Sequence, residues 1–576
     1  MMDSIPRQFM AWADRKPDAT AFAVKQDGEW KQSTWKQYVE EVRLAARGFM
    51  ALGLEPGQSV GIMGFNRPQW TMSDLAAMSS QGVPVGVYSS CSAKQTAYIL
   101  GHAGARLAVV ESGNVLDRVL SVRDELPDLK HVIVMDAEET PDGTMSWSAL
   151  LEMGRSVEEE ALEERLSAIR PDDLGTLIYT SGTTGPPKGS MLSHGNLAAA
   201  TLMGRELLPV EIREDARLLS YLPMAHAAER ALTLLGPSAF GVAIYYAESI
   251  ERMPANLVEV QPDVFLGVPR VWEKIHAGLT AKLAEATGTK ARVANWSRDV
   301  GLAYHSAVTS GGNPSPALKL KYALASKLLF SRIRAALGLS RAQVLLTGAA
   351  PISEEVLRDL ASLDLPLREV YGQTEGSGPT TNNKPEATRW GSVGQPFAGV
   401  ELKIADDDEI LMRSDAVFQG YYKDAESTAD VLRGGWLHTG DLGYLDEDGY
   451  LYVTGRKKEI IITAGGKNIS PRNIEEAVKT HALVNEAVVI GDRKPFLSIL
   501  VCLEPEAELP ADEAKAKIWE HVERMNQNLS KVEQVKKIAV LPTVFSVEGG
   551  ELTPTLKLRR SVIVDKYSRE IDAIYG

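Results

Sequence analysis

The sequence predicts an α/β protein with a large N-terminal domain of layered sheets and helices and a smaller α+β C-terminal domain. Two observations carry this prediction. Short apolar runs alternate with amphipathic helical stretches over most of the chain, which is typical of sheets layered with helices. After Gly455 the character of the sequence changes to that of a smaller α+β unit, so we place a domain boundary near Arg456–Lys458. A length of 576 residues leaves ample chain for large buried cores.

In the first half of the chain, apolar runs that end in turns predict buried strands, and apolar residues at helical spacing predict helices. The strands are expected over residues 60–64, 107–110, 132–135 and 264–268, and the helices over residues 35–52 and 94–102. Ser156 and Glu159 have the spacing of a capping box, so a glutamate-rich helix is expected to start there and to end at about Ile169.

From residue 289 to residue 337 the pattern is almost wholly helical, with a loop predicted over residues 311–316. Asp446–Gly449 predicts the turn of a β-hairpin. In the C-terminal domain, Ser470 and Pro471 are typical of an N-cap and a first helical residue. Four further strands are expected, over residues 344–346, 367–370, 488–490 and 497–503.

The composition is that of an acidic globular protein. Lysine plus arginine number 62 and aspartate plus glutamate 76, so the net charge is −14, which argues against a nucleic-acid partner. The two cysteines, Cys91 and Cys502, exclude a disulfide framework and favour a reducing, cytoplasmic compartment. Charges begin at Asp3, and no run approaches the roughly 20 apolar residues that a membrane span needs. We expect a soluble protein, and peripheral contact with the inner face of a membrane stays open.

The segment from Tyr179 to Ser190 has the chemistry of a phosphate-binding loop. Its glycines permit close approach of the backbone to an anion, and its hydroxyls and one ammonium group supply hydrogen-bond donors. The candidate phosphate-binding residues are Thr180, Ser181, Gly182, Thr183, Thr184, Gly185 and Lys188. Pro187 precedes the lysine, so the segment is not a Walker A loop. An ordinary surface loop is the alternative, and the length of this run argues against it.

Five further motifs follow in order along the chain. They are Tyr371-Gly-Gln-Thr-Glu375, Trp436-Leu-His-Thr-Gly-Asp441, Gly455-Arg-Lys-Lys-Glu459, Gly465-Gly-Lys-Asn-Ile469 and Pro554-Thr-Leu-Lys557. With the glycine-rich segment, they resemble the motifs of the adenylate-forming superfamily, which contains acyl-CoA synthetases, firefly luciferases and the adenylation domains of peptide synthetases. The resemblance covers nearly the whole chain. It implies the adenylate-forming fold, with residues 1–455 as the AMP- and acyl-binding domain, a hinge at residues 456–458 and a mobile domain at residues 459–576.

The resemblance also implies the reaction, in which a carboxylate attacks the α-phosphorus of ATP and pyrophosphate leaves. Positioning and charge neutralisation carry such a step. Glu375 would bind the Mg²⁺ that bridges phosphate oxygens, because this hard cation prefers oxygen ligands. Thr374 would donate a hydrogen bond to the α-phosphate, and Lys557 would neutralise the charges of the carboxylate and the α-phosphate.

The remaining nucleotide contacts are implied by the same motifs. Tyr371 would stack on adenine, and Asp441 would accept hydrogen bonds from both ribose hydroxyls, to which Arg456 would add a contact. The other residues expected along the nucleotide are Gly348, Ala349, Ala350, Gly372 and Gln373.

Several of these residues have an ordinary structural alternative. His226 matches an acyl-pocket histidine of the family, but its apolar surroundings also suit a structural histidine. Tyr371 could be a core aromatic, Lys458 a solvated loop residue instead of the hinge pivot, and Lys557 a solvated lysine in a basic tail beside Arg559.

Three segments resemble the long-chain acyl-CoA synthetase branch, including its bubblegum-type relatives. They are residues 267–274, the helical insertion that contains residues 327–338, and the end motif at residues 553–560. Three apolar segments could line an acyl tunnel or form plain core, and they are residues 222–224, 240–246 and 264–268. Long-chain specificity therefore rests on the resemblance alone.

The expected activity is ATP-dependent ligation of a fatty acid to coenzyme A through an acyl-AMP intermediate, with ATP and CoA as co-substrates and Mg²⁺ as cofactor. A fatty acyl-AMP ligase that passes the acyl group to a carrier protein is the alternative, although we find no counterpart of the insertion those relatives carry. A peptide-synthetase module would need a carrier domain, which is not expected because the chain ends soon after Arg560. An adenylate sensor would have lost Lys557 or Glu375, and both are present. Neither chain length nor oligomeric state is indicated.

Overall fold

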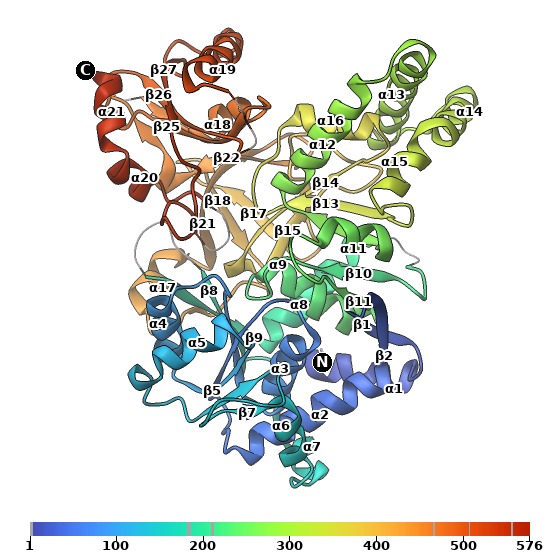
Figure 1. Cartoon of the computed structure of the whole chain (residues 1–576), viewed down its shortest axis with the longest axis vertical. Helices are drawn as coiled ribbons and strands as arrows, with labels where there is room; N and C mark the ends of the chain where they lie inside the picture. The colour runs from blue at the N-terminus through green and yellow to red at the C-terminus, as the bar shows by residue number, and fades with distance from the viewer. Residues whose placement is uncertain are drawn as a thin grey trace.

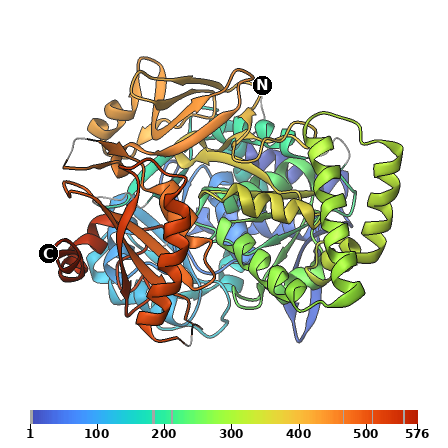
Figure 2. The ribbon, with the colours of Figure 1, turned by 90° about the horizontal axis from the view of Figure 1, so that it is seen from above.

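The structure is a computed structural model that describes residues 4–180, 186–208, 212–464, 467–505, 507, 509–553 and 557–576. Two large sheets form most of the molecule, and a small C-terminal unit, orange to red in Figure 1, lies at the upper left of that view. Figure 2 shows the same unit from above, beside the large sheets.

The first large sheet has nine strands and is mostly parallel in its middle. In order they are β16 (Gln395–Pro396), β15 (Gly378–Asn382), β14 (Arg368–Gln373), β13 (Val344–Gly348), β12 (Val264–Gly267), β10 (Arg217–Ser220), β11 (Ala243–Tyr246), β1 (Thr20–Gln26) and β2 (Glu29–Thr34). Side chains alternate between its faces, as the period of a strand requires. On β13, Leu345 packs into the core on the outer face, whereas Val344 and Leu346 pack on the inner face.

The second large sheet has eight strands. In order they are β19 (Gly420–Tyr421), β9 (Lys188–Ser193), β8 (Leu174–Thr180), β4 (Val83–Val87), β3 (Ser59–Met63), β5 (Ala105–Val110), β6 (His131–Val134) and β7 (Met145–Ser146). The strands from β8 to β7 run parallel, and β9 and β19 extend the sheet antiparallel beyond β8.

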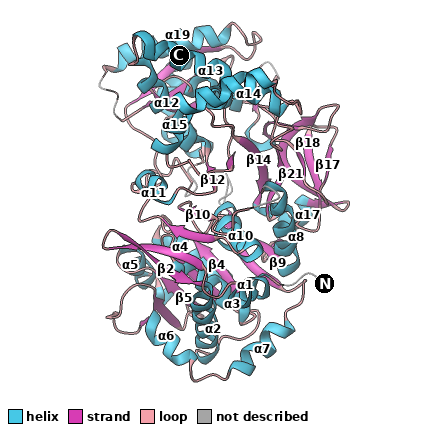
Figure 3. Cartoon of the chain, turned by 90° about the vertical axis from the view of Figure 1, so that its right-hand side faces the viewer, coloured by secondary structure: helices cyan, strands magenta, loops and turns pink. Residues whose placement is uncertain are grey.

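Helices between and around the two sheets complete this large unit (Figure 3). In the N-terminal part they are α1 (Ile5–Arg15), α2 (Trp35–Ala51), α3 (Pro68–Ser79), α4 (Ala93–Ala103), α5 (Asn114–Ser121), η1 (Arg123–Glu125), α6 (Trp147–Gly154), α7 (Glu159–Ala168), α8 (His194–Gly204) and η2 (Arg205–Leu207). Nearly every residue of α3 and most residues of α8 are buried, as expected for apolar helices in an interior. Both contribute to the largest core, which joins the two sheets.

The middle of the chain supplies helices to both faces of the nine-stranded sheet, and residues 227–240 pack on the inner face. Its helices are α9 (Ala227–Arg230), η3 (Ala231–Leu235), α10 (Gly236–Phe240), α11 (Met253–Val260), α12 (Pro269–Ala284), α13 (Gly288–Thr309), α14 (Pro316–Ala325), η4 (Ser326–Phe330), α15 (Ser331–Ala336) and α16 (Glu354–Ser362). Side chains of α11, α12, α15 and α16 pack into the outer core of this sheet.

Three smaller sheets follow. The first contains β17 (Glu401–Ile404), β18 (Glu409–Arg413), β20 (Leu432–Arg433), β21 (Trp436–Leu445) and β22 (Leu451–Arg456). Helix α17 (Ala425–Val431) precedes β20, whereas η5 (Thr374–Gly376) lies between β14 and β15 of the nine-stranded sheet. The C-terminal unit contains η6 (Lys457–Glu459), β23 (Ile461–Ile462), β24 (Asn468–Ile469), α18 (Arg472–Lys479), β25 (Val484–Ile490), β26 (Leu497–Leu503), α19 (Ala511–Asn526), β27 (Val535–Leu541), α20 (Arg560–Lys566) and α21 (Ser568–Tyr575). Strands β25 to β27 form one sheet with its own apolar cores.

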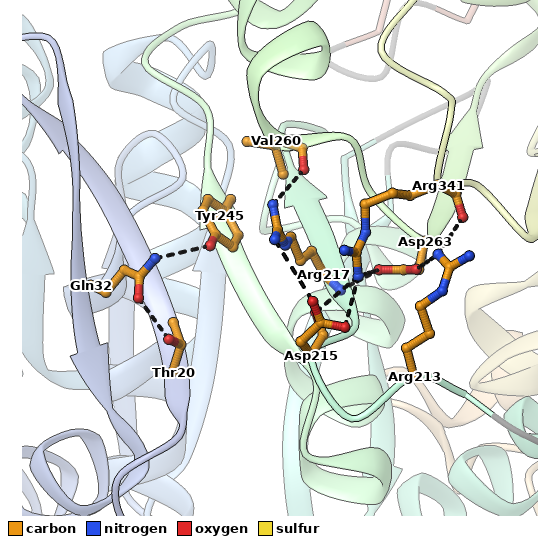
Figure 4. A network of polar contacts seen from close by, with 9 residues as sticks. All are labelled: Thr20, Gln32, Arg213, Asp215, Arg217, Tyr245, Val260, Asp263 and Arg341. Carbon is orange, nitrogen blue, oxygen red and sulfur yellow. Dashed lines mark hydrogen bonds and ion pairs between the residues drawn. The ribbon is translucent and has the colours of Figure 1, made fainter. Parts of the chain in front are cut away.

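A buried carboxylate connects the starts of three neighbouring central strands of the nine-stranded sheet (Figure 4). Asp263, which is fully buried just before β12, accepts a hydrogen bond from the backbone nitrogen of Arg217, 2.9 Å away. Arg213 and Arg341 form ion pairs with the same carboxylate. A buried charge is costly unless it is paired, and here three groups from two other segments satisfy it. The starts of β10, β12 and β13 are therefore fixed relative to one another.

Most elements agree with the sequence-based expectations. All the expected strands are present, the helical stretch of residues 289–337 is interrupted at the expected loop, and Asp446–Gly449 turns between β21 and β22. Two capping predictions are wrong. Ser156 donates to the carbonyl of Met153 at the end of α6, and α7 begins only at Glu159. Ser470 donates to the carbonyl of Thr454 on β22, and α18 begins at Arg472.

Cys91 and Cys502 are both buried and unpaired, in agreement with the absence of a disulfide framework. Within the described ranges, no helix combines the length and the apolar character that a bilayer crossing requires.

Candidate active site

The predicted motifs meet where β14 of the nine-stranded sheet reaches the hairpin of β21 and β22. Asp441 and Arg456 are register partners in this antiparallel pair, and Nε of Arg456 lies 3.1 Å from Oδ1 of Asp441. From the other side, the hydroxyl of Tyr371 on β14 donates to Oδ2 of Asp441 over 2.8 Å. Burial and the negative charge of Asp441 raise the pKa of Tyr371, so the phenol remains a donor. The carboxylate is therefore held from both sides.

Glycine makes the close approach of β14 to its neighbours possible. A Cβ atom on Gly372 would collide with the carbonyl group of Gly378 on β15, and one on Gly348 would approach the carbonyl oxygen of Val370 to 2.7 Å. The segment Gly348–Ala350 leaves β13 beside Tyr371, and Ala349 has a left-handed backbone with φ 67°. Both alanines are exposed. This strip and the tyrosine form the surface where adenine is predicted to lie.

Glu375 lies in the short turn η5 directly after β14, and its carboxylate is held by a residue that the sequence did not indicate. The hydroxyl of Tyr421 on β19 donates to Oε1 of Glu375 over 2.8 Å. The ammonium nitrogen of Lys188, at the start of β9, lies 5.1 Å from the ring centroid of Tyr421. It donates a hydrogen bond to the hydroxyl of Ser427 and is 3.4 Å from Oδ2 of Asp424. Tyr421 thus stands between the predicted metal ligand and the predicted phosphate-binding lysine.

Lys557 reaches this site from the C-terminal unit. Burial and the positive charge of Arg456 lower the pKa of Lys557 to about 8, against the opposing attraction of Asp441 and Glu375. The backbone at Lys557 is fixed by hydrogen bonds with Thr553, at 2.8 and 3.0 Å. A pKa of about 8 leaves the ammonium mostly protonated at neutral pH. The predicted catalytic lysine therefore brings a positive charge to the predicted nucleotide site.

His226 lies close enough to Lys557 for the two charges to interact. Burial and the charge of Lys557 lower the pKa of His226 to about 4, so its ring is neutral at neutral pH. Its Nδ1 accepts a hydrogen bond from the backbone nitrogen of Ala228 over 3.2 Å and thereby caps α9. The histidine thus has a structural role, which is compatible with the predicted place beside the acyl group.

The residues at this site fit a nucleotide and a hard cation. The side-chain nitrogen of Gln373 is buried, and no described residue accepts a hydrogen bond from it, so an acceptor atom of a ligand could satisfy this donor. The described part of the chain contains no group of three or more potential metal ligands. A Mg²⁺ ion here would therefore be held by Glu375 together with phosphate oxygens, which is the usual mode for this ion.

An apolar cavity of about 80 Å³ lies next to the site, on the inner face of the nine-stranded sheet. Ser377 and Pro379, which follow Glu375 closely in the chain, line one end of it. Its apolar walls include Leu207, Leu218, Leu235, Phe240, Val264 and Leu346. Two of the three candidate acyl segments, residues 240–246 and 264–268, contribute to the lining.

Parts of three motifs fall outside the described residues. They are Ser181, Gly182, Thr183, Thr184 and Gly185 of the glycine-rich segment, Gly465 and Gly466, and Pro554 to Leu556. Thr180 and Lys188 flank the first gap and are register partners at the ends of β8 and β9. Thr374, at the first position of η5, is buried. The structure thus brings Thr374, Glu375, Tyr371, Asp441, Arg456 and Lys557 to one site.

A protein-family model for "AMP-binding enzyme" matches residues 9–422, well over half of the chain. The chain belongs to the AMP-binding enzyme family. A model for the "AMP-binding enzyme C-terminal domain" matches residues 458–576. The resemblance to the adenylate-forming superfamily is thereby confirmed.

Relatives of this AMP-binding enzyme include proteins named long-chain-fatty-acid–CoA ligase. The ligase ACSBG2 of Xenopus laevis is 37% identical over 99% of this chain and 84% of the relative. FadD15 of Mycobacterium bovis is 34% identical over 97% of this chain and 95% of the relative.

Solved structures share the fold of this AMP-binding enzyme. An anthranilate CoA ligase, AuaEII, in complex with anthranoyl-AMP matches 100% of this chain and 98% of its own at a TM-score of 0.76 and 19% identity. The o-succinylbenzoate CoA synthetase MenE of Bacillus subtilis, in complex with ATP and a magnesium ion, matches 96% of this chain and 98% of its own at a TM-score of 0.69 and 20% identity. The predicted adenylate-forming fold is confirmed.

Proposed function

We propose that this AMP-binding enzyme ligates a long-chain fatty acid to coenzyme A in two half-reactions, through an acyl-AMP intermediate, with release of AMP and pyrophosphate. The observation that carries the proposal is the position of Lys557. This lysine comes from the C-terminal unit, and the charges of Arg456, Asp441 and Glu375 act on its pKa. The names of the relatives support the choice of substrate.

In the first half-reaction the fatty acid carboxylate attacks the α-phosphorus of ATP, and the bond to pyrophosphate breaks. Two anions must approach each other, so the charge of Lys557 would stabilise the transition state. Thr374 would donate a hydrogen bond to an α-phosphate oxygen. Neutral His226 would line the start of the acyl site, where it adds no second positive charge.

The nucleotide would be bound by the residues that already hold one another in place. Asp441 would accept from the ribose hydroxyls with its remaining lone pairs, and Arg456 would add a contact. Tyr371, Gly372, Gln373 and the strip Gly348–Ala350 would surround adenine. Thr180, Lys188 and the glycine-rich residues 181–185 would bind the outer phosphates. Mg²⁺, held by Glu375, would supply charge neutralisation between the phosphate oxygens.

In the second half-reaction the thiol of CoA attacks the acyl carbonyl and AMP leaves. We place the hinge for the accompanying domain rotation at residues 456–458, between a large domain of residues 1–455 and a small one of residues 459–576. Lys557 would leave the site during this rotation. Because proline restricts the backbone, Lys458→Pro should impair one half-reaction more than the other.

The apolar cavity beside Ser377 and Pro379 is our candidate for the acyl site. Burial of each methylene of a fatty acid stabilises its complex by about 0.8 kcal/mol, so a longer apolar slot favours a longer acid. Nucleic acid is not proposed as a partner. Peripheral membrane contact is compatible with a substrate that partitions into lipid.

The test measures both half-reactions on the same protein. The enzyme is incubated with ATP, Mg²⁺ and palmitate, with and without CoA, and pyrophosphate exchange and palmitoyl-CoA are quantified. We expect pyrophosphate exchange in the absence of CoA and formation of palmitoyl-CoA in its presence. Lys557→Ala should slow acyl-adenylate formation by about 100-fold or more. The rate of thioester formation from supplied acyl-adenylate should stay near that of the wild type. Exchange without any thioester would favour the alternative, a fatty acyl-AMP ligase.

A further inference from the structure

The outer face of the helix formed by α14 and η4 exposes a row of leucines. Leu320, Leu324 and Leu328 are 75%, 50% and 37% exposed, and their spacing of four residues puts them on one side of the helix. Figures 1 and 2 show this helix beside α13 at the periphery of the molecule. Single exposed leucines are common on protein surfaces, whereas a row of three on one helix face is a continuous apolar surface.

The inner face of the same helix is firmly attached, so the leucines cannot turn inward. Leu318, Ala325 and Leu329 belong to a small apolar cluster that also contains residues of α13. Tyr322 stacks on Tyr304 of α13, with ring centroids 3.8 Å apart.

Buried Asp364 strengthens this attachment. Its Oδ1 accepts a hydrogen bond from Tyr322 of α14 and is 2.9 Å from Nε2 of His305 on α13. Arg334 of α15 lies 3.6 Å from its other oxygen. One carboxylate thus joins three helices to the body of the protein, and the outer face is held in a fixed orientation.

Every charged residue of α14, η4 and α15, the continuous helical stretch that carries the leucine row, is a lysine or an arginine. Of these, Lys321, Lys327 and Arg332 are exposed, and helical spacing places them on the side that carries the leucines. The chain contains no aspartate or glutamate between Asp299 and Glu354, although its overall net charge is −14. A basic and apolar face on an acidic protein is complementary to a surface that is negatively charged above an apolar layer.

We propose that this face, defined by Leu320, Leu324 and Leu328 with Lys321, Lys327 and Arg332, docks the enzyme on an anionic lipid bilayer. The leucines would enter the boundary between headgroups and acyl chains, and the long cationic side chains would reach the headgroup phosphates. A second copy of the chain is a poorer occupant. In a symmetric dimer through this face, the same cations would oppose one another. Docking does not depend on the proposed ligase activity, because the face lies outside the active-site residues.

The test is co-sedimentation of the full-length protein with vesicles of phosphatidylcholine alone or with about one third phosphatidylglycerol. We expect binding to rise at least about fivefold with the anionic lipid and to fall as salt is added. The triple variant Leu320→Asn/Leu324→Asn/Leu328→Asn should lose about tenfold or more of its vesicle affinity, as should Lys321→Gln/Lys327→Gln/Arg332→Gln. Circular dichroism and thermal unfolding check that each variant is folded.

Matched controls replace exposed residues of the same kinds on other elements. Ile250→Asn/Val532→Asn/Val564→Asn removes three apolar side chains that are 51%, 48% and 41% exposed, and Lys515→Gln/Lys531→Gln/Lys536→Gln removes three exposed lysines of the C-terminal unit. Both controls should bind vesicles like the wild type. The proposal is overturned if the wild type does not bind anionic vesicles, if the controls lose as much affinity as the helix variants, or if the leucine variant instead abolishes a dimer detected by sedimentation in lipid-free buffer.

Discussion

The hydroxyl of Tyr421 donates a hydrogen bond to Oε1 of Glu375 over a distance of 2.8 Å. Tyr421 lies on β19, at the edge of the eight-stranded sheet, and Glu375 follows β14 of the nine-stranded sheet. This bond therefore joins the two large sheets at the predicted metal ligand. Burial and the charge of Glu375 raise the pKa of Tyr421, which keeps the phenol protonated as a donor.

Tyr421→Phe should raise the Mg²⁺ concentration needed for half-maximal adenylation about three- to tenfold, because loss of one hydrogen bond leaves the carboxylate less well oriented. Glu375→Gln should have a larger effect. The measurement is a Mg²⁺ titration of pyrophosphate exchange. Tyr444→Phe, at a tyrosine that is 50% exposed, is the control. An unchanged titration in both site variants would remove Glu375 from the metal site.

Asp441→Asn should raise the apparent ATP constant by about tenfold or more, because the ribose would lose a charged acceptor and Arg456 its ion-pair partner. Isothermal titration with ATP checks this expectation. Tyr371→Phe removes the hydroxyl that donates to Asp441 but leaves the carboxylate, so it should weaken ATP binding less. Normal ATP affinity in folded Asp441→Asn would contradict the ribose assignment.

The rate of adenylation should depend on the protonation of Lys557. Its pKa is lowered to about 8, so the charged form is lost as the pH rises through that value. We expect kcat/KM for ATP, which reports on the free enzyme, to fall on the alkaline side of about pH 8. Lys557→Arg should shift this alkaline fall of kcat/KM to higher pH, since arginine stays protonated. His226, whose pKa is lowered to about 4, should cause no further change in kcat/KM near neutral pH. If kcat/KM of Lys557→Arg falls at the same pH as that of the wild type, the titrating group is not Lys557.

Arg270 on α12 forms an ion pair with Glu504, which follows β26 in the C-terminal unit. This contact supports the arrangement in which Lys557 is in the site. Arg270→Gln should therefore slow adenylation about two- to fivefold and leave the acyl transfer step unchanged, on the scale of a partly exposed ion pair. Single-turnover assays of the two steps separate these effects. Arg252→Gln, whose partner Glu248 is in the same unit, should change neither.

Gly236→Leu should shift the substrate preference towards shorter acids. Gly236 lines the apolar cavity, and a Cβ atom there would be in ordinary contact with Leu218, another lining residue. A leucine would therefore occupy space proposed for the acyl chain. Activity on acids of increasing length provides the measurement. Gly278→Leu, at an open position on α12, should leave the length profile unchanged. A wild-type profile in Gly236→Leu would place the acyl chain elsewhere.

The core of the candidate site could be predicted from the sequence because its motifs are local. The residues Asp446–Gly449 predict a turn, and a hairpin closed there makes Asp441 and Arg456 partners. Glu375 needs only the end of one strand and a short turn to reach its place. Where spacing along the chain determines geometry, the sequence is sufficient.

Contacts between distant segments could not be predicted in this way. The local pattern at Tyr421 does not distinguish it from a core aromatic, and its bond to Glu375 depends on how the two sheets pack. The same applies to Ser470, which has the composition of an N-cap but donates to Thr454 on β22. A hydroxyl that finds a tertiary acceptor is no longer available to a helix end.

The pairing of β1 with β11 has a consequence for how the chain is made. Phe22 is the register partner of Ile244, so the N-terminal hairpin of β1 and β2 completes its sheet only after about 220 further residues have been synthesised. At ribosomal rates of about 5 to 20 residues per second, this amounts to about 10 to 40 seconds. During that time the apolar face of the hairpin and one edge of β1 remain without their final neighbours. The nascent chain thus passes through an extended aggregation-sensitive interval, so we expect chaperones present during synthesis to raise the yield of folded enzyme.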